Sequence, residues 1–263
     1  MWTDKIFSLV VYTVNFVQNK YWLLAGEIII FIIVCRAIFM SILLIRTSSI
    51  SRKNMLYSRI VNGGKKILIV GDSTAVGTGA DRKEDTIAGR LAHDFPRTSI
   101  LNCAKNGSLT RAAISQIKAT SDKFDLVIVS TGGNDVWNLT SLPHVYRDLT
   151  GAVECAKAAS NGKVIVLFFG NEGSAPFFPQ PIRAILNKRT EKIRKVFRKV
   201  SQEKNVLLVD LFSGDESDNP FVNDPKRFFA KDRLHPNSEG YRRWYERMWL
   251  TLTQKGYLFN DNN

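Results

Sequence analysis

The sequence predicts a three-layer α/β/α sandwich with a five-stranded parallel sheet, preceded by a separate N-terminal hydrophobic helix. Five short runs rich in Ile, Val and Leu begin at intervals of roughly 27–42 residues, which leaves room for a crossover helix after each run. Runs that are apolar on both faces are typical of central parallel strands. A longer apolar run near the N-terminus predicts the additional helix.

The composition excludes several classes of protein. The chain has 263 residues with 17 Gly and 8 Pro, so it is neither collagenous nor of low complexity. Its three Cys residues, none in a CxxC pair, exclude a disulfide scaffold and a zinc ribbon. The length suits one α/β domain of ordinary size with an appendage.

The N-terminal region, residues 1–45, contains the long apolar run. Residues 22–45 hold only two charged side chains, and a helix of that length would be about 36 Å long, enough to cross a bilayer. Tyr21 and Trp22 stand at one end, as interfacial aromatic residues do. The run is too long and starts too late for a cleaved signal peptide. We therefore expect a membrane anchor.

Arg36, near the middle of this run, leaves the manner of insertion open. A central Arg costs roughly 2.5–3.5 kcal/mol on insertion scales, which the apolar residues on either side can offset. One alternative is a tilted or interfacial helix in which Arg36 reaches the surface, with residues 6–17 beside it in the interface. Another is a buried helix of a larger soluble core.

The positive charge is concentrated in the N-terminal part. The chain carries a net charge of +13, and residues 1–66 hold nine Lys and Arg against two Asp and Glu. Such an excess favours an anionic partner, and the apolar run beside it favours a phospholipid surface; nucleic acid is not expected as a partner. More basic residues follow the run than precede it, which predicts that the larger C-terminal part is cytoplasmic.

The remaining boundaries follow from composition. Residues 46–66 are polar and basic and end in Gly-Gly and two Lys, which predicts a linker. The α/β domain then covers residues 67–255, and residues 256–263 form a tail. The predicted strands are Ile67–Val70, Ser99–Cys103, Leu126–Ser130, Val164–Phe169 and Val206–Asp210.

Residues Ile182–Val200 show the clearest helical spacing between the predicted strands. One face is apolar and the other carries eight Lys and Arg: Arg183, Lys188, Arg189, Lys192, Arg194, Lys195, Arg198 and Lys199. The pattern fits a crossover helix with a solvated basic face. It also fits a basic face that rests on anionic lipid headgroups.

Chemistry-bearing side chains follow the predicted strands. Ser73 follows the first strand in a Gly-Asp-Ser turn, Asn134 follows the third, and Asp232 and His235 lie near the C-terminus. The carboxyl ends of parallel strands meet at one edge of a sheet, so we expect these side chains to lie close together. Acyl transfer needs a nucleophile, a base, a group that orients the base, and oxyanion donors. Ser73, His235 and Asp232 can supply the first three.

These blocks resemble the SGNH (GDSL-type) hydrolases over about residues 65–250. The matching blocks, in order, are Gly71-Asp72-Ser73, Gly107, Gly132-Gly133-Asn134-Asp135 and Asp232-Arg233-Leu234-His235. The resemblance implies a flavodoxin-like fold, Ser73 as nucleophile, His235 as general base and Asp232 as its orienting partner. It also implies an oxyanion hole formed by Ser73, Gly107 and Asn134. Thr74 stands where the family usually has Leu.

Four residues are weaker candidates for the substrate pocket. Thr74 follows the nucleophile, and Trp137 follows the Gly-Gly-Asn-Asp block. Phe177 and Phe178 follow the fourth predicted strand, where they can form an apolar lip for an acyl chain or cap the core. The chemistry needs no cofactor and no metal, and His93 and His144 are too scattered to hold one with His235.

Together these features predict a membrane-anchored serine esterase that hydrolyses acyl esters of lipid or lysophospholipid type. The same triad would serve an O-acetyl esterase acting on carbohydrate or cell-envelope glycan, a thioesterase or an acyltransferase. A membrane-tethered binding module is the non-enzymatic alternative. The sequence does not select the acyl chain, the alcohol or the oligomeric state.

Overall fold

The computed structural model describes residues 21–39, 41–42, 45, 55–212 and 219–257. The chain divides into two compact units, Met1–Ser49 and Ile50–Asn263, which are considered separately. The C-terminal tail expected at 256–263 lies outside the described residues after Tyr257.

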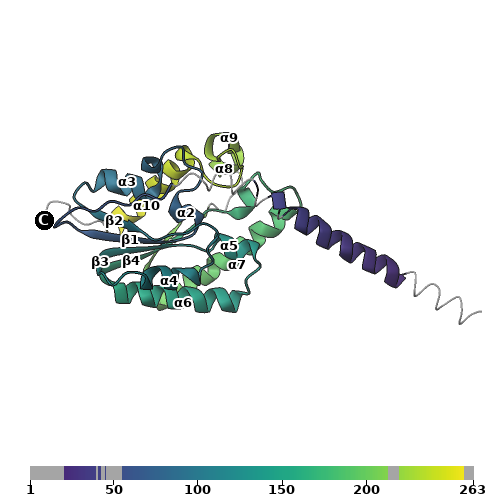
Figure 1. Ribbon diagram of the computed structural model, residues 1–263, viewed down its shortest axis with the longest axis horizontal. Helices are drawn as coiled ribbons and strands as arrows, with labels where there is room; N and C mark the ends of the chain where they lie inside the picture. The colour runs from purple at the N-terminus through teal and green to yellow at the C-terminus, as the bar shows by residue number, and fades with distance from the viewer. Residues whose placement is uncertain (1–20, 40, 43–44, 46–54, 213–218, 258–263) are drawn as a thin grey trace, which may run out of the picture. The chain divides into compact units, whose positions relative to one another are not determined.

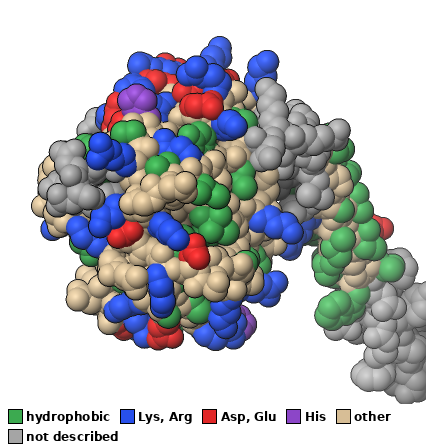
Figure 2. Space-filling model, turned by 60° about the vertical axis from the view of Figure 1, so that its left-hand side comes forward, with side chains coloured by type: hydrophobic (Ala, Val, Ile, Leu, Met, Phe, Trp, Pro, Cys, Tyr) green, Lys and Arg blue, Asp and Glu red, His purple; other side chains and the backbone are tan. Residues whose placement is uncertain are grey.

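The described part of the N-terminal unit contains the helix Tyr21–Phe39. With 19 residues and a mean hydropathy of 2.3, it is long and apolar enough to cross a membrane. None of its apolar stretch is buried. A signal sequence meets the same criteria. Figure 2 shows hydrophobic side chains covering this helix, whereas Lys and Arg are scattered over the visible face of the larger unit.

The larger unit is built on the predicted five-stranded parallel sheet. The strands follow the order β2-β1-β3-β4-β5. Their bounds are β1 Lys66–Gly71, β2 Ser99–Asn102, β3 Phe124–Ser130, β4 Ser160–Phe168 and β5 Leu207–Asp210. All four strand pairs are parallel, which confirms the predicted fold class. The chain first pairs β2 on one side of β1 and then β3 on the other, so the carboxyl end of β1 lies at a topological switch point.

Helices cover both faces of the sheet and complete the three layers (Figure 1). One face carries α3 Ile87–Asp94 and α10 Ser238–Gln254. The other carries α4 Ala112–Lys118, α6 Leu142–Ala159 and α7 Ile182–Glu203. Short helical turns follow the strands: α2 Ser73–Val76, η1 Lys83–Asp85, α5 Gly133–Trp137, η2 Glu172–Ser174, α8 Pro220–Asn223 and α9 Pro225–Phe228.

The core forms where the apolar strand faces meet these helices. Leu68, Val127 and Val129 of the central strands are fully buried and pack with Ala152 and Ala156 of α6. Small residues on the helix let it approach the sheet closely, while the branched strand residues fill the space between them. This packing fixes the strand ends on which the functional groups stand.

The second half of the segment expected to be a linker packs on the domain. The main chain of Arg59 pairs with Ile100 in an antiparallel bridge, and Ser58 Oγ accepts a hydrogen bond from the backbone of Asn102 at 3.1 Å. Met55 is buried. This strap, residues 55–61, therefore runs from the carboxyl end of β2 toward its amino end before the chain turns into β1.

Helix α7 differs from the expected basic face in one respect. Arg183 and Arg189 bond to backbone carbonyls of the domain, and Arg194 pairs with Asp210 at 2.8 Å. Lys188, Lys192, Lys195, Arg198 and Lys199 are exposed. Long Arg side chains can extend along a helix to reach polar groups beneath it. These three Arg residues, which the helical pattern predicted to be solvated, instead hold the helix against the domain.

Arg189 gives a testable prediction about stability. Its guanidinium donates to the carbonyls of Val136 at 3.1 Å and Asp135 at 3.3 Å, and also to that of Thr140. Arg189→Ala removes charge-assisted hydrogen bonds from carbonyls at the end of α5, so we expect the free energy of unfolding to fall by about 1.5–3 kcal/mol. Urea denaturation measures this. The control, Lys192→Ala on the exposed face of α7, should change it by less than about 0.5 kcal/mol.

Candidate active site

Three predicted residues form a continuous hydrogen-bonded chain at the carboxyl edge of the sheet. His235 Nε2 lies 2.9 Å from Ser73 Oγ. His235 Nδ1 lies 2.6 Å from Asp232 Oδ2. Asp232 and His235 are buried, whereas Ser73 is partly exposed. The geometry thus brings together a hydroxyl, an imidazole and a carboxylate in the order that nucleophilic acyl transfer requires.

Asp232 is fixed by its own loop. Its Oδ1 accepts backbone N–H bonds from Leu234 at 3.0 Å and His235 at 3.1 Å, which leaves Oδ2 for the imidazole. Burial acts to raise the pKa of Asp232, but the bonds from His235 and the backbone outweigh it, so the pKa is lowered. The three-residue spacing of Asp and His therefore sets both the orientation and the charge of this pair.

Ser73 stands at the sharp turn between β1 and α2. Asp72 caps α2, because its Oδ1 accepts bonds from Thr74 N at 2.9 Å and Thr74 Oγ at 2.8 Å. Gly71 N and O both bond to the side-chain amide of Gln116, which holds the end of β1. The predicted pocket residue Thr74 is thus engaged with Asp72, and it stabilises the turn that presents Ser73.

The expected oxyanion donors lie on neighbouring elements: Gly107 is in the loop after β2, and Asn134 is in α5. Gly107 has a positive φ of +75°, and nothing lies within 4 Å of where a Cβ would be, so its backbone borders open space. Asn134 Nδ2 donates to Ser108 O at 3.0 Å, which orients the amide toward the Gly107 loop. The second amide hydrogen of Asn134 remains available for another acceptor.

Asp135 connects α5 to the segment that follows Gly107, a role that the sequence analysis did not assign. Its buried Oδ2 accepts from both Thr110 N at 2.9 Å and Thr110 Oγ at 2.7 Å. The loop carrying Gly107 is thereby fastened to α5, which carries Asn134. The sequence held a signal for this role in Asp135, the last residue of the Gly-Gly-Asn-Asp block, because a buried carboxylate needs hydrogen-bond donors.

The aromatic candidates for the pocket form one cluster. The ring centroids of Trp137 and Phe178 lie 4.0 Å apart, and those of Phe177 and Phe178 lie 5.2 Å apart. Phe178 is buried, whereas Trp137 and Phe177 are partly exposed. Phe177 N bonds to Arg233 O at 3.0 Å. The cluster therefore links α5 to the loop that carries Asp232 and His235.

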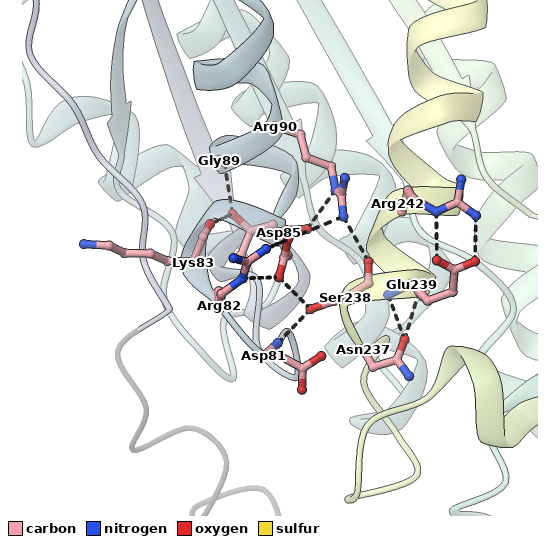
Figure 3. Close-up of polar contacts among 12 residues, drawn as sticks. Asp81, Arg82, Lys83, Asp85, Gly89, Arg90, Asn237, Ser238, Glu239 and Arg242 are labelled. Carbon is pink, nitrogen blue, oxygen red and sulfur yellow. Dashed lines mark hydrogen bonds and ion pairs between the residues drawn. The ribbon is translucent and has the colours of Figure 1, made fainter.

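A polar network holds the start of α10, just after His235, against the segment that follows Ser73 (Figure 3). Ser238 Oγ accepts from Asp81 N at 2.9 Å and donates to Asp85 Oδ2 at 3.1 Å. Arg90 donates to Asp85 O at 3.0 Å and to Ser238 O at 3.2 Å. Sequence reasoning missed this network, because its members are separated by about 150 residues and follow no local motif.

Two further contacts complete this junction. Tyr241 OH, fully buried in α10, donates to Thr78 O at 2.8 Å. A Cβ on Gly79 would lie 2.8 Å from His235 Cβ and 2.4 Å from Pro236 O. Only glycine allows the two loops to approach so closely, and this approach brings His235 within reach of Ser73.

The other candidates lie away from the site. His93 and His144 are exposed and bond to their neighbours Asp94 and Ser141. Among the described residues, no group of three or more His, Cys, Asp or Glu side chains is arranged to hold a metal ion.

Comparisons with known proteins agree with this fold. The family model of the GDSL-like lipase/acylhydrolase family matches residues 69–243. A member of the lipolytic protein G-D-S-L family from Veillonella parvula is 20% identical, with a TM-score of 0.56 over 72% of this chain and 98% of that one. The psychrotrophic esterase EstA from Pseudoalteromonas is 17% identical, with a TM-score of 0.53 over 74% and 100%. The search of curated proteins gives no match.

The fold and the matched residues define the class: this chain belongs to the GDSL-like lipase/acylhydrolase family. It is accordingly an ester-hydrolysing enzyme, and the family resemblance drawn from the sequence is confirmed.

The network of Figure 3 predicts a coupled loss of stability and activity. Ser238→Ala removes the hydroxyl that bonds both Asp81 N and Asp85 Oδ2. We expect the free energy of unfolding to fall by about 1–2 kcal/mol. We also expect kcat/KM for ester hydrolysis to fall, because the loop that carries His235 is held less firmly. Thermal unfolding and kcat/KM measure the two effects. Ser115→Ala is the matched control, since that exposed hydroxyl bonds only within its own helix; an equal loss there would contradict the assignment.

Proposed function

We propose that this protein is a membrane-anchored serine esterase that hydrolyses acyl esters of lipid or lysophospholipid type through a Ser73–His235–Asp232 triad. The observation that carries the proposal is the pair of hydrogen bonds from Ser73 to His235 and from His235 to Asp232, at 2.9 and 2.6 Å. The same two bonds would be needed for hydrolysis of any carboxylic ester, so the substrate class rests on other features.

The reaction proceeds through an acyl-enzyme. His235 Nε2 takes the Ser73 proton as Oγ attacks the ester carbonyl, and the ionised Asp232 stabilises the imidazolium that forms. The Asn134 amide and the backbone N–H groups of Gly107 and Ser73 donate to the oxyanion. His235 then returns the proton to the leaving alcohol. Water, activated by the same imidazole, releases the acid and restores the Ser73 hydroxyl.

An apolar acyl chain is favoured by the aromatic residues beside the site. Trp137 and Phe177 are partly exposed and flank the elements that carry Asn134 and His235. Aromatic rings at the edge of a site offer apolar contact area to a chain without requiring a polar partner from it. Phe178, which is buried beneath them, supports the lip.

Membrane anchoring by residues 22–45 fits this substrate. The strap 55–61 begins at the carboxyl end of β2, which is the edge that carries Ser73. Only residues 46–54 separate it from the apolar run. A membrane-bound helix would therefore be joined to the catalytic domain by a short tether. The basic residues after the run favour a cytoplasmic location for this domain.

Hydrolysis of p-nitrophenyl esters from acetyl to palmitoyl tests the activity and the substrate together. With the detergent-solubilised full chain, we expect kcat/KM to rise with acyl length. Ser73→Ala should reduce it by more than about 10³-fold, and Asn134→Ala by about 10²–10³-fold through loss of one oxyanion donor.

The outcomes separate the alternatives. A rate that depends on Ser73 but is confined to the acetyl ester would support an O-acetyl esterase acting on glycans. If Ser73→Ala cleaves these esters as fast as the parent, the triad is wrongly assigned. If the parent cleaves none of them, a tethered binding module becomes the better interpretation.

Extraction of membranes with alkaline carbonate tests the anchor. We expect the full chain to remain in the membrane pellet with residues 22–45 still attached, as shown by intact mass. Ile33→Lys adds a charge that costs roughly 2.5–3.5 kcal/mol near the centre of a span, so part of the protein should be released. The control Arg36→Leu should be retained at least as well as the parent. A mature chain that lacks residues 22–45 would instead identify a cleaved signal sequence.

A further inference from the structure

Two carboxyl groups approach the backbone of Gly133 from different elements. Asp72 comes from the turn before α2 and Glu172 from η2, which follows β4. A Cβ built on Gly133 would lie 2.9 Å from Glu172 Oε1 and 3.6 Å from Asp72 Oδ2. The two carboxyl groups therefore share the space next to the residue that precedes Asn134.

Asp72 is incompletely satisfied in this position. Its side chain is only 1% exposed, and Oδ1 is occupied by Thr74. None of the described residues donates a hydrogen bond to the buried Oδ2. A buried carboxylate oxygen without a donor is costly. A neutral carboxyl group in the neighbourhood is one way to reduce that cost, because it adds no like charge and carries a proton that can be donated.

Glu172 is held beside Asp72 by its surroundings. The side chain of Asn171 caps the η2 turn, and Arg183 donates to the carbonyls of Gly173 and Ser174 rather than to the carboxylate. The Trp137 indole lies near enough to the Glu172 carboxyl to act on its pKa. Glu172 is thus fixed between the aromatic cluster and the turn of Ser73.

The electrostatic setting favours the neutral form of Glu172. Burial and then the nearby Asp72 carboxylate raise the pKa of Glu172 to about 8, against the lowering effect of the Trp137 indole. Burial also raises the pKa of Asp72 to about 6, against the bonds from Thr74. Ionising Glu172 would place a second negative charge beside Asp72 in a poorly hydrated space.

Other charged or titratable groups face the pair from the elements around it. His235 favours the ionised form of Asp72, whereas Asp135 on α5 disfavours it. Tyr241 reaches Asp72 from α10. Arg189, from α7, donates to backbone carbonyls of α5. Arg183 and Arg189 donate to backbone carbonyls, so they leave the two carboxyl groups without a guanidinium partner among the residues that the structure describes.

We propose that Glu172 is a positioning residue for catalysis: its neutral carboxyl lets the turns that carry Ser73 and Asn134 pack together around Gly133, and its ionisation forces them apart. The proton lost from Glu172 passes to solvent, and no bond to substrate is involved. The inference rests on the proposed roles of Ser73 and Asn134. Activity should then have an alkaline limit set by Glu172, separate from the acid limit set by the catalytic base.

The pH profile of kcat/KM between pH 6 and 10 tests this inference with a short-chain ester and the detergent-solubilised full chain. A group that must be protonated and has a pKa of about 8 is about one-tenth protonated at pH 9, so the parent should lose about tenfold between its plateau and pH 9. Glu172→Gln keeps the shape and cannot ionise, so its ratio of rates at pH 9 and pH 7 should stay near one. Glu191→Gln, an exposed site on α7, should retain the profile of the parent. Equal alkaline limits in the parent and Glu172→Gln would overturn the proposal.

Unfolding in the Ser73→Ala background provides a readout that needs no activity. A carboxyl whose pKa is raised by folding stabilises the protein fully below its unfolded pKa, and this contribution is lost as the pH rises through about 8. The melting temperature of Ser73→Ala should therefore fall between pH 5 and 9 relative to Ser73→Ala/Glu172→Gln. If the double variant does not fold, the fall of the single variant between pH 7 and 9 decides, because Asp72, with a pKa of about 6, has already lost most of its contribution below pH 7. If the difference in melting temperature between the two variants does not change with pH, or if the melting temperature does not fall, the proposal for Glu172 is contradicted even if the triad is correct. A clear fall in melting temperature together with full activity in Ser73→Ala would instead reject only the triad.

Discussion

The structure of this site depends on one long-range approach, that of the histidine loop to the nucleophile turn. Ser73 and His235 lie 162 residues apart in sequence and are joined by a 2.9 Å hydrogen bond. Parallel strands bring their carboxyl ends to one edge, but that arrangement alone positions a side chain only to within several ångströms. The close contact of Gly79 with His235, and the bond from Tyr241 to Thr78, supply the remaining accuracy.

The fold was largely predictable, because buried parallel strands leave a strong local signal. Each of the five apolar runs is a strand, but β4 begins at Ser160 rather than at Val164. Residues Ser160–Lys163 are polar or lack an apolar side chain, so their pairing with β3 depends on the neighbouring strand rather than on their own composition. Arg189 was misjudged for a related reason: helical periodicity gives the direction of a Cβ but not the reach of a guanidinium.

The residues of the candidate site also divide into those that the sequence predicted and those that it did not. Ser73, Asn134, Asp232 and His235 follow motifs whose spacing is local, and each stands at the expected edge. Their supporting residues were not predictable. Ser238 and Glu172 have ordinary sequence neighbours, and they acquire a role only when distant loops close around them. Supporting residues of this kind determine whether a catalytic group is held within the tolerance that its chemistry requires.

The carboxyl groups around the site differ in a way that follows from their partners. Asp232 is buried but receives bonds from His235 and two backbone amides, and its pKa is lowered. Asp72 is buried and Glu172 is partly buried; both receive fewer donors than Asp232, and both pKa values are raised. Burial acts to raise the pKa in all three cases, so the number of donors decides the sign. Further negative charge beside Asn134 would oppose the negative charge that develops on the oxyanion in the transition state. One ionised carboxylate behind the imidazole therefore favours the reaction more than three ionised carboxylates around the site would.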